Sequence, residues 1–324
     1  MKSKFRWGII GASEIANKFC DAIERIGECE VVAISSRSLD RAKQFAEKNR
    51  IGKAYGSYEE MLQNEKLDAV YIATATGDHY AACKLCAKYA FPFLCEKTMC
   101  VNSEQTIDVF RTMEEKQVFC MEAMWSRFLP MIQKAGEWVK NQKIGEIKFA
   151  EVSLGFCAPP GENNRFWNPK LGGGAAYDLL VYAYEIMRFL LDKPILNHNI
   201  MIVESKTGVD ASDVLILQYE DSIAVLKASM ETIMSEELII YGTKGRIVIP
   251  NLLFGNEVVR YDNGSVCEEM YRDDETTNGF VYEIKEVVRC VREGRIESDI
   301  VPHSLTIDFV KICDEIIETE GIRE

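Results

Sequence analysis

Short apolar runs alternate with amphipathic stretches over the first 122 residues. Runs with buried-strand character occur at residues 5–10, 30–35, 54–55, 68–74, 93–95 and 118–121. Between them, polar and apolar positions recur with helical spacing at residues 14–26, 39–48, 57–63, 78–90 and 102–116. Ser38, Ser57 and Asn102 are suited to cap the helices that they precede. Strands that alternate with helices in this way predict an α/β fold with a doubly wound parallel sheet.

The pattern changes after residue 122. A helix is predicted at residues 130–142, a strand at 146–157, and a long helix at 172–191 that begins with three glycines. Residues 199–270 then read as closely spaced strands, at 199–205, 212–220, 223–230, 236–241, 245–249, 256–261 and 265–270. Short connections between strands favour a large, mostly antiparallel sheet. Helices at 279–292 and 304–318 end the pattern, so we expect a nucleotide-binding domain at 1–122 and an α+β domain at 123–324.

Composition narrows the classes of partner. A chain of 324 residues is long enough for two domains, each with its own core. The net charge of −13 argues against nucleic acid or an anionic membrane as a partner. We expect no secretory signal, because the first residues lack a sustained apolar stretch, and no apolar run approaches membrane-spanning length.

The 11 cysteines are scattered through predicted helices and strands. This distribution favours reduced thiols and a cytoplasmic location. Cys83 and Cys86 have a spacing known from metal and redox sites, but they lie in a predicted amphipathic helix without a second ligand pair. We therefore expect them to pack in the core, and we expect no metal site.

The segment from Phe5 to Ala16 combines a strand, a turn and a helix start. Gly11 occupies the first position of a G-x-G-x-x-G/A pattern, Ser13 replaces the second glycine, and Ala16 fills the third position. In such a turn the unpaired N–H groups of the helix face a pyrophosphate. An ordinary strand–helix turn with one glycine is the alternative.

The end of the second predicted strand bears on the type of dinucleotide. Folds that bind NAD place a carboxylate there to hold the ribose 2′-hydroxyl. This chain instead has Ser36 and Arg37, with Arg41 one turn into the next helix. Hydroxyl and guanidinium groups bind a 2′-phosphate, so the sequence favours NADP, the alternative being a solvated loop with a surface arginine.

Glu96 and Lys97 directly follow the apolar strand at residues 93–95. Sheets of this class bind ligands beyond the carboxyl ends of their strands. The pair is therefore expected in a cleft, and an exposed surface lysine is the alternative.

An ordered series of short motifs runs through the chain. It comprises Gly8–Ala16, Ser36–Ala42, Tyr55–Glu60, Ala73-Thr74 with His79, Glu96-Lys97, Met121–Phe128, Gly172–Gly174 with Asp178 and Tyr182, Thr207–Asp210 and Gly242–Gly245. In this series the chain resembles the Gfo/Idh/MocA oxidoreductase family. The resemblance implies a Rossmann domain followed by an α+β domain whose open sheet commonly forms a homodimer interface. It also implies NAD(P)-dependent oxidation of a small sugar or cyclic diol.

The resemblance assigns site residues. The family's lysine corresponds to Lys97 and its acid–base residue to Tyr182, with Asp178 nearby to orient the substrate or to cap local structure. Arg165 and Trp167 lie in a loop that would contact nicotinamide or substrate, although packing is an equal alternative for Trp167. The cofactor residues that we expect are Gly11, Ser13, Glu14, Ile15, Ser36, Arg37, Arg41, Ala73, Thr74, His79, Glu96, Lys97, Arg165 and Trp167.

The chain departs from the family pattern at Ala75, Thr76, Thr98 and Leu180. All four positions adjoin the expected site, so a changed substrate is a more natural consequence than a changed fold. His79 is expected to support the cofactor loop.

The expected chemistry can be argued from the residues. Asp178 and Tyr182 are four apart and share a helix face. A tyrosine accepts a proton only when ionised, and a cation such as Lys97 would favour that state. Three alternatives remain: an inositol or amino-sugar dehydrogenase, a non-catalytic NADP-binding regulator, and a hydrolase that keeps its nicotinamide bound.

Overall fold

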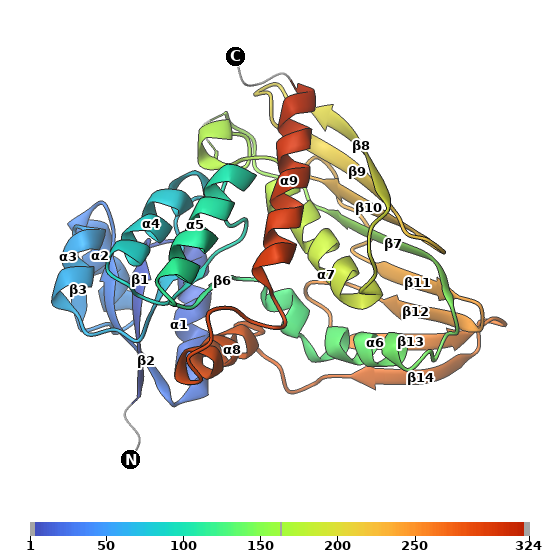
Figure 1. Cartoon of the computed structure of the whole chain (residues 1–324), viewed down its shortest axis with the longest axis horizontal. Coiled ribbons are helices and arrows are strands. Elements are labelled where there is room, and N and C mark those ends of the chain that lie inside the picture. Colours follow the sequence, from blue (N-terminus) through green and yellow to red (C-terminus); the bar gives the residue numbers. More distant parts are fainter. Residues whose placement is uncertain (1–3, 163, 321–324) are drawn as a thin grey trace. The chain divides into compact units, whose positions relative to one another are not determined.

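The computed structural model describes residues 4–162 and 164–320. The chain forms two compact units (Figure 1). The first comprises the residues up to Trp125 together with Asn278–Lys311, and the second comprises Ser126–Thr277 and the residues from Ile312 onward. Compact units need not coincide with domains that fold alone, so the division between residues 122 and 123 stays a prediction.

The first unit is built on a six-stranded parallel sheet. Its strands are β1 (Phe5–Ile10), β2 (Cys29–Ser35), β3 (Lys53–Tyr55), β4 (Ala69–Ile72), β5 (Phe93–Cys95) and β6 (Cys120–Glu122). Their order is β3-β2-β1-β4-β5-β6, and each neighbouring pair is parallel. The direction of the strand order reverses between β1 and β4, which is where doubly wound sheets bind their ligands. The predicted fold class is confirmed for this unit.

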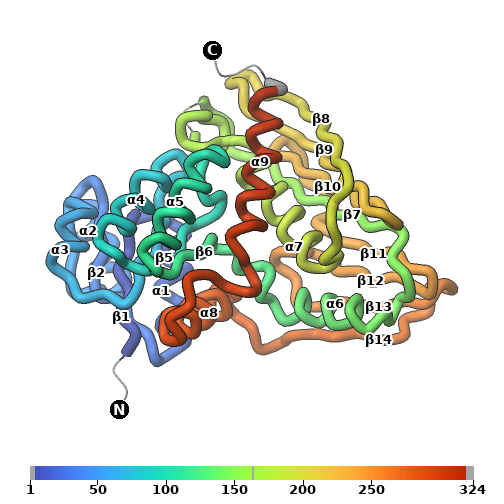
Figure 2. The backbone as a smooth tube through the Cα atoms, viewed as in Figure 1, coloured from blue at the N-terminus to red at the C-terminus, as the bar shows by residue number. Residues whose placement is uncertain are grey.

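Helices cover both faces of this sheet. They are α1 (Glu14–Ile26), α2 (Leu39–Lys48), α3 (Tyr58–Asn64), α4 (Thr76–Lys88) and α5 (Ser103–Glu115), together with α8 (Phe280–Arg292) from much later in the chain. Figure 2 shows α4 and α5 side by side, and they bury a core that includes Cys83 and Cys86 against the strands. On the face of α1, the ring of Phe19 stacks on Tyr71 at 3.9 Å and meets Trp7 edge-on.

Three helix starts are fixed by the predicted caps. The side chains of Ser38, Ser57 and Asn102 accept the backbone N–H groups of Arg41, Glu60 and Gln105, at 3.4, 3.4 and 2.8 Å. Each bond satisfies one of the amides that a helix N-terminus leaves without a partner. These local predictions are confirmed.

The second unit contains an eight-stranded sheet. Its strands are β7 (Ile147–Gly155), β8 (Asn197–Glu204), β9 (Asp210–Gln218), β10 (Ile223–Ser229), β11 (Leu238–Gly242), β12 (Gly245–Ile249), β13 (Glu257–Asp262) and β14 (Cys267–Arg272). Their order is β14-β13-β12-β11-β7-β10-β9-β8. Among the described strands of this eight-stranded sheet, only β10 and β7 pair in parallel. The expected mostly antiparallel sheet is therefore confirmed.

The two faces of this sheet differ. Leu215, Leu217 and Leu226 are fully buried on the face that α6 (Pro130–Lys140) and α7 (Val181–Leu191) cover (Figure 1). The opposite face is more exposed and mixes apolar with charged side chains. Phe149 and Ile223, 38% and 42% exposed, lie side by side on β7 and β10, and the ion pair of Glu151 with Lys227 lies on the same two strands.

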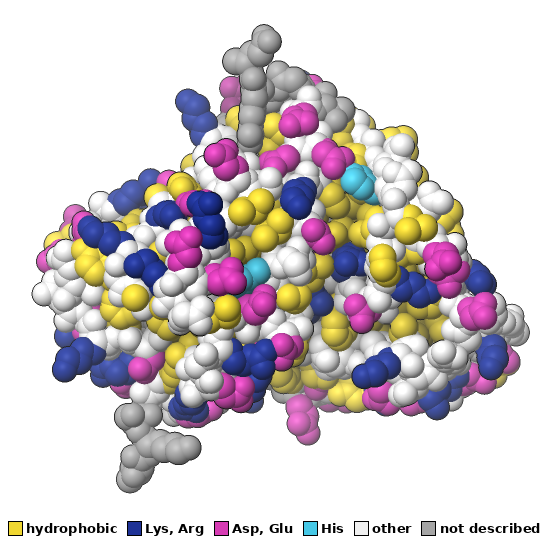
Figure 3. Space-filling model, in the orientation of Figure 1, with side chains coloured by type: hydrophobic (Ala, Val, Ile, Leu, Met, Phe, Trp, Pro, Cys, Tyr) yellow, Lys and Arg dark blue, Asp and Glu magenta, His cyan; other side chains and the backbone are white. Residues whose placement is uncertain are grey.

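Shorter helical segments lie between the longer elements. They are the 3₁₀ turns η1 (Trp125–Phe128) and η2 (Pro169–Leu171) and the π-helical turn η3 (Ala176–Leu180), which runs directly into α7. The last helix, α9 (His303–Glu320), begins in the first unit. Acidic, basic and apolar side chains are interspersed on the surface shown in Figure 3.

The helix predicted from residue 172 starts later than expected. Its three glycines lie before the helical segment, and Gly174 has φ of +131°. That conformation is incompatible with a helix and strained for any residue with a Cβ. The helical start at Ala176 is set by a contact with a distant strand, described below.

Candidate active site

The turn after β1 brings two strand ends into close contact. Gly11 has φ of +106°, and a Cβ on this residue would lie 2.7 Å from the carbonyl oxygen of Ala73, which follows β4. Only glycine therefore allows the ends of β1 and β4 to approach this closely. The structure thus places Gly11 and Ala73, both predicted cofactor residues, together at the point where the strand order reverses.

Two buried hydroxyl groups flank this turn. Ser13 Oγ and Thr74 Oγ1 have no hydrogen-bond partner among the residues that the structure describes. Ser13 is the N-cap residue of α1, but its side chain does not cap the helix. Unsatisfied buried polar atoms are costly, and a bound ligand is one way to satisfy them. Beside a glycine turn and a helix N-terminus, these hydroxyls fit the phosphates of a dinucleotide. Glu14 and Ile15, exposed and half-buried, form the first turn of α1.

The loop after β2 carries the residues expected to bind a 2′-phosphate. Ser36 is buried, and its hydroxyl accepts the backbone N–H of Ser38 at 3.4 Å. The side chain of Arg37 is 73% exposed, and its Nη1 lies 3.3 Å from Oδ2 of Asp78 at the start of α4. Arg41 reaches back to the glycine turn, where its Nη2 donates to the carbonyl oxygen of Ala12 at 3.0 Å. An acid therefore reaches this site from another loop, which the sequence did not indicate.

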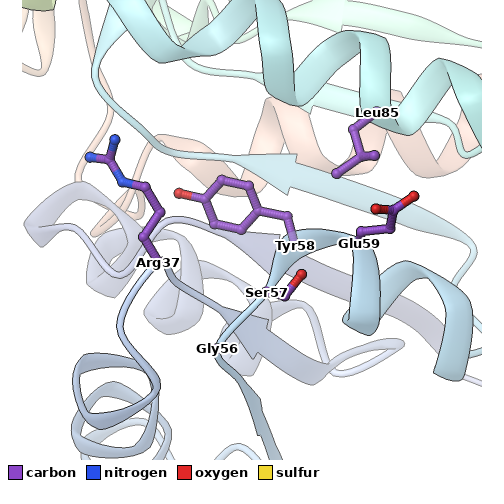
Figure 4. A pocket seen from close by; sticks show the side chains of 6 residues that line it. All are labelled: Arg37, Gly56, Ser57, Tyr58, Glu59 and Leu85. Atoms are coloured by element: carbon purple, nitrogen blue, oxygen red, sulfur yellow. The ribbon is translucent and has the colours of Figure 1, made fainter.

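A cavity of about 350 Å³ opens beside Arg37. Figure 4 shows the hydroxyl of Tyr58 directed toward the Arg37 side chain, with Ser57, Glu59 and Leu85 on the other walls. Burial raises the pKa of Tyr58, and the positive charge of Arg37 opposes that shift. The cavity thus combines a guanidinium, an aromatic ring and a hydroxyl.

His79 joins two loops rather than facing solvent. Its ring is 1% exposed, with Nδ1 2.9 Å from the carbonyl oxygen of Thr98 and Nε2 3.1 Å from that of Thr74. Burial lowers its pKa, which favours the neutral ring near pH 7. His79 therefore supports the loops after β4 and β5.

Glu96 and Lys97 leave the end of β5 in different environments. Glu96 is 6% exposed and accepts a hydrogen bond of 2.5 Å from the hydroxyl of Tyr71. Lys97 is partly exposed, and the peptide bond between it and the fully buried Thr98 is cis. The following residue, Met99, donates its N–H to Oε1 of Glu122 at 2.7 Å. The backbone around Lys97 is thus held by buried polar contacts.

A second buried carboxyl group, which the sequence did not indicate, lies near Glu96. Glu283 of α8 is fully buried, and neither of its side-chain oxygens has a hydrogen-bond partner among the described residues. Burial, and to a smaller extent the charge of Glu96, raise the pKa of Glu283 well above its usual range. Its only sequence signal is a glutamate on an apolar helix face.

The second unit holds the remaining predicted site residues. Asp178 lies in η3, and Tyr182, 9% exposed, lies in the first turn of α7. Arg165 donates from Nη1 to Oδ1 of Asp178 at 3.2 Å and places its guanidinium 3.9 Å from the ring centroid of Phe166. Trp167 Nε1 donates to the carbonyl oxygen of Pro159 at 2.9 Å, so this residue bridges its own loop. The structure brings Arg165 and Asp178 together.

A buried ion pair anchors α7. Arg127 Nη1 lies 2.9 Å from Oε2 of Glu185, and the two side chains are 7% and 0% exposed. Burial lowers the pKa of Arg127, while Glu185 opposes that shift. Breaking such a pair leaves an uncompensated buried charge. The helix that carries Tyr182 is therefore tied to η1.

The described residues offer neither a metal site nor a membrane-crossing helix. Within residues 4–162 and 164–320, no cluster of three or more His, Cys, Asp or Glu side chains is arranged to hold a metal ion. Over the same residues, no helix combines the length and apolar character needed to cross a membrane. Burial raises the pKa of Cys86 well above its usual range, as expected for a thiol packed in a core.

The strand order, the glycine turn and the hydroxyls beside it define a dinucleotide-binding protein with a Rossmann domain. The family model described as an oxidoreductase family with an NAD-binding Rossmann fold matches residues 5–124, and the GFO/IDH/MocA C-terminal domain matches residues 132–248. The chain belongs to the Gfo/Idh/MocA family. The expected family and enzyme class, an NAD(P)-dependent dehydrogenase, are confirmed.

Curated relatives match along the whole chain. Trans-1,2-dihydrobenzene-1,2-diol dehydrogenase of Mus musculus is 32% identical over 330 residues, which cover 98% of this chain and 97% of the mouse protein. The human enzyme of the same name is 29% identical, with the same coverage of 98% and 97%.

Solved structures share the fold. Levoglucosan dehydrogenase in complex with NADH and levoglucosan superposes with a TM-score of 0.88 at 16% identity, covering 99% of this chain and 98% of its own. An aldose–aldose oxidoreductase from Caulobacter crescentus gives 0.87 at 18% identity with coverage of 99% and 98%. A 3-ketoreductase from Actinomadura kijaniata in complex with TDP-benzene and NADP gives 0.84 at 21% identity, covering 96% of both chains.

Proposed function

We propose that this protein is an NADP-dependent oxidoreductase that transfers a hydride between nicotinamide and a hydroxyl or carbonyl carbon of a sugar or cyclic diol. The full-length similarity to dihydrobenzenediol dehydrogenases supports the diol, and the names of the structural neighbours support the sugar. The observation that carries the choice of cofactor is Arg37 beside the cavity at the end of β2.

The residues of the first unit fit a dinucleotide. The turn at Gly11 and the hydroxyls of Ser13 and Thr74 would hold its phosphates, and Ser36 with Arg37 would hold a 2′-phosphate. When bound, the cofactor supplies the hydride acceptor or donor. Arg41 of α2 would contribute positive charge while its guanidinium stays hydrogen-bonded to Ala12 in the glycine turn.

Tyr182 and Lys97 are the proposed acid–base and cationic groups. Oxidation of a carbinol releases a proton together with the hydride, and a tyrosinate accepts it. Lys97 would hold the substrate oxygen and favour ionisation of Tyr182. Asp178, with Arg165 at 3.2 Å, would orient the substrate. Lys97 and Tyr182 belong to different compact units, so substitution of both residues is the test of whether they act together.

Two further proposals concern the assembly and location of the protein. The exposed apolar side chains on the outer face of the eight-stranded sheet, Phe149 and Ile223 among them, support a homodimer, because exposed apolar surface is typical of an interface. The many buried cysteine thiols support a reducing, cytoplasmic location.

The test is a screen of aldoses, polyols, inositols, amino sugars and diols with NADP and with NAD, followed by absorbance at the reduced nicotinamide band. Turnover of a sugar or diol with NADP preferred is the expected result. Inositol or amino-sugar oxidation would reassign the substrate. Tight NADP binding without turnover would indicate a regulator, and copurified NAD(H) with glycoside cleavage would indicate a hydrolase.

A further inference from the structure

A carboxylate from the eight-stranded sheet reaches the start of the helical segment that carries Asp178 and Tyr182. Asp210, the first residue of β9, is 3% exposed, and its Oδ2 accepts the backbone N–H of Ala176 at 2.5 Å. Ala176 begins η3, in which Asp178 lies, and η3 runs into α7 with Tyr182. The first amides of a helix have no partner within the helix, so an acceptor there stabilises the segment's start.

The glycine run makes room for this carboxylate. A Cβ on Gly174 would lie 2.1 Å from Oδ1 of Asp210, and Gly174 has φ of +131°. The chain before η3 therefore wraps around the Asp210 side chain, and a larger residue would expel it. This explains why the glycines precede the helix rather than form its first turn.

The surroundings keep the carboxyl group in one place. Burial raises the pKa of Asp210 to about 6, whereas hydrogen bonds from the backbone amides of Ala176 and Ala175 lower it. A buried carboxyl group without such partners would be strongly disfavoured, so these bonds locate it.

We propose that Asp210 is a positioning residue of the active site, which fixes the start of η3 and thereby the placement of Asp178 and Tyr182. The π-helical turn that begins at Ala176 is the reason why the start of this segment matters. Such turns are rare, are common at functional sites, and shift the residues that follow them around the helix axis. The π-helical turn, Ala176–Leu180, lies between the contact with Asp210 and Tyr182. The contact therefore fixes the first residue of the segment that determines where Tyr182 lies around the helix axis. The catalytic part of this inference rests on the proposed function, whereas its structural part does not.

The test compares Asp210→Ala with Asp210→Asn, because the asparagine retains an oxygen that accepts the N–H of Ala176. Ser212→Ala is the matched control. It removes another side-chain hydrogen bond of the same strand, the 2.7 Å contact with Ser229, and leaves the bond between Asp210 and Ala176 in place. The readouts are amide hydrogen exchange of a peptide covering residues 174–182, the dissociation constant of NADP, and kcat with KM.

Asp210→Ala is expected to speed exchange in residues 174–182 and to lower kcat, each by about tenfold as for a lost helix cap. NADP affinity should stay within about twofold, since the cap of η3 lies outside the cofactor-binding unit. Asp210→Asn should restore both exchange and kcat to near wild-type values, and Ser212→Ala should resemble wild type.

Wild-type exchange of residues 174–182 in Asp210→Ala would overturn the proposal, and so would a kcat loss in Asp210→Asn equal to that in Asp210→Ala. If Asp210→Ala does not fold, Gly174→Ala provides the second route. Its Cβ would displace the carboxylate, so it should reproduce the local increase in exchange, and unchanged exchange would contradict the proposal. A wild-type protein without turnover on any sugar or diol would refute the proposed function but leave the exchange experiment fully informative.

Discussion

The guanidinium group of Arg37 lies 3.3 Å from the carboxylate of Asp78. Arg37 lies in the loop after β2, and Asp78 belongs to the first turn of α4. Two separate segments of the Rossmann unit therefore each contribute one charge to the expected 2′-phosphate site. For NADP the arginine is favourable and the carboxylate is not, since the 2′-phosphate is an anion. We infer that the balance between these two charges sets the relative affinities for NADP and NAD.

Substitutions of Arg37 and Asp78 should change the affinities for NADP and NAD by different factors. Arg37→Ala should weaken NADP by about tenfold or more, the size of a lost charge-assisted hydrogen bond, and leave NAD nearly unchanged. Asp78→Asn should tighten NADP by roughly two- to fivefold, as expected for removal of a solvent-exposed charge. Asp40→Asn, which changes an exposed carboxylate in the first turn of α2, is the control. Fluorescence titration measures the dissociation constants of NADP and NAD for the wild type and each variant, and equal losses for NADP and NAD in Arg37→Ala would contradict the NADP assignment.

Tyr182→Phe should lower kcat by roughly 10²–10⁴-fold while NADP still binds, because it removes only the acid–base group. Tyr184→Phe removes a hydroxyl from a neighbouring buried position of α7 and should cost far less. The pH profile of the wild type should rise through a pKa below that of free tyrosine, and this limb should vanish in Tyr182→Phe. Turnover within about threefold of wild type would mean that the tyrosine only packs.

Lys97→Met should be at least as damaging as Tyr182→Phe, because it removes both the oxygen contact and the cation. A double-mutant cycle then tests their cooperation across the two compact units. If the residues work together, the double variant should lose much less than the product of the two single losses. Independent, multiplicative losses would show that Lys97 does not assist Tyr182.

Dimerisation can be tested on the outer face of the eight-stranded sheet. Ile223 is 42% exposed and pairs across the strands with Phe149. Ile223→Glu should convert a dimer into monomers, because a charge would have to be buried in an apolar interface. Val266→Glu is the control, since Val266 is 62% exposed in the turn between β13 and β14. Multi-angle light scattering at micromolar concentration gives the mass, and a monomeric wild type would rule out the dimer.

The ionised carboxylate of Asp108, in α5, should stabilise the folded protein, and this stabilisation should be lost at strongly acidic pH. Lys84 and Tyr80 of α4 donate to its Oδ2 at 2.7 and 2.9 Å and, together with Arg111, lower its pKa from 3.8 to about 2. A lowered pKa means that the unfolded chain binds the proton first on acidification. The contribution is therefore present above about pH 4 and lost as pH falls toward 2.

Asp108→Asn should remove this acid dependence. Between pH 4 and pH 2, the free energy of unfolding of the wild type should fall by about 1 kcal/mol more than that of the variant, after allowance for solvent screening. Urea denaturation at several pH values measures the difference. Parallel pH curves for the two proteins would show that Asp108 does not stabilise the α4–α5 contact.

Local sequence features predicted the helices and strands and much of the chemistry. The alternating strands and helices, the caps Ser38, Ser57 and Asn102, and the glycine turn at Gly11 were all predicted, and the structure contains them. These features depend on side-chain periodicity and on bonds within a few residues, so the information is local. The placement of Lys97 after a strand end is of the same kind.

Which distant groups meet depends on the tertiary structure. Asp78 reaches Arg37, and Asp210 reaches Ala176, because sheet order brings together loops and strands that are far apart in the chain. The start of the predicted helix at residue 172 was wrong for this reason. Gly174 has φ of +131°, outside the helical region, and lies so close to the buried carboxylate of Asp210 that a Cβ there would be 2.1 Å from Oδ1. Helical pattern is a property of neighbours along the chain, whereas this steric conflict exists only once the sheet has formed.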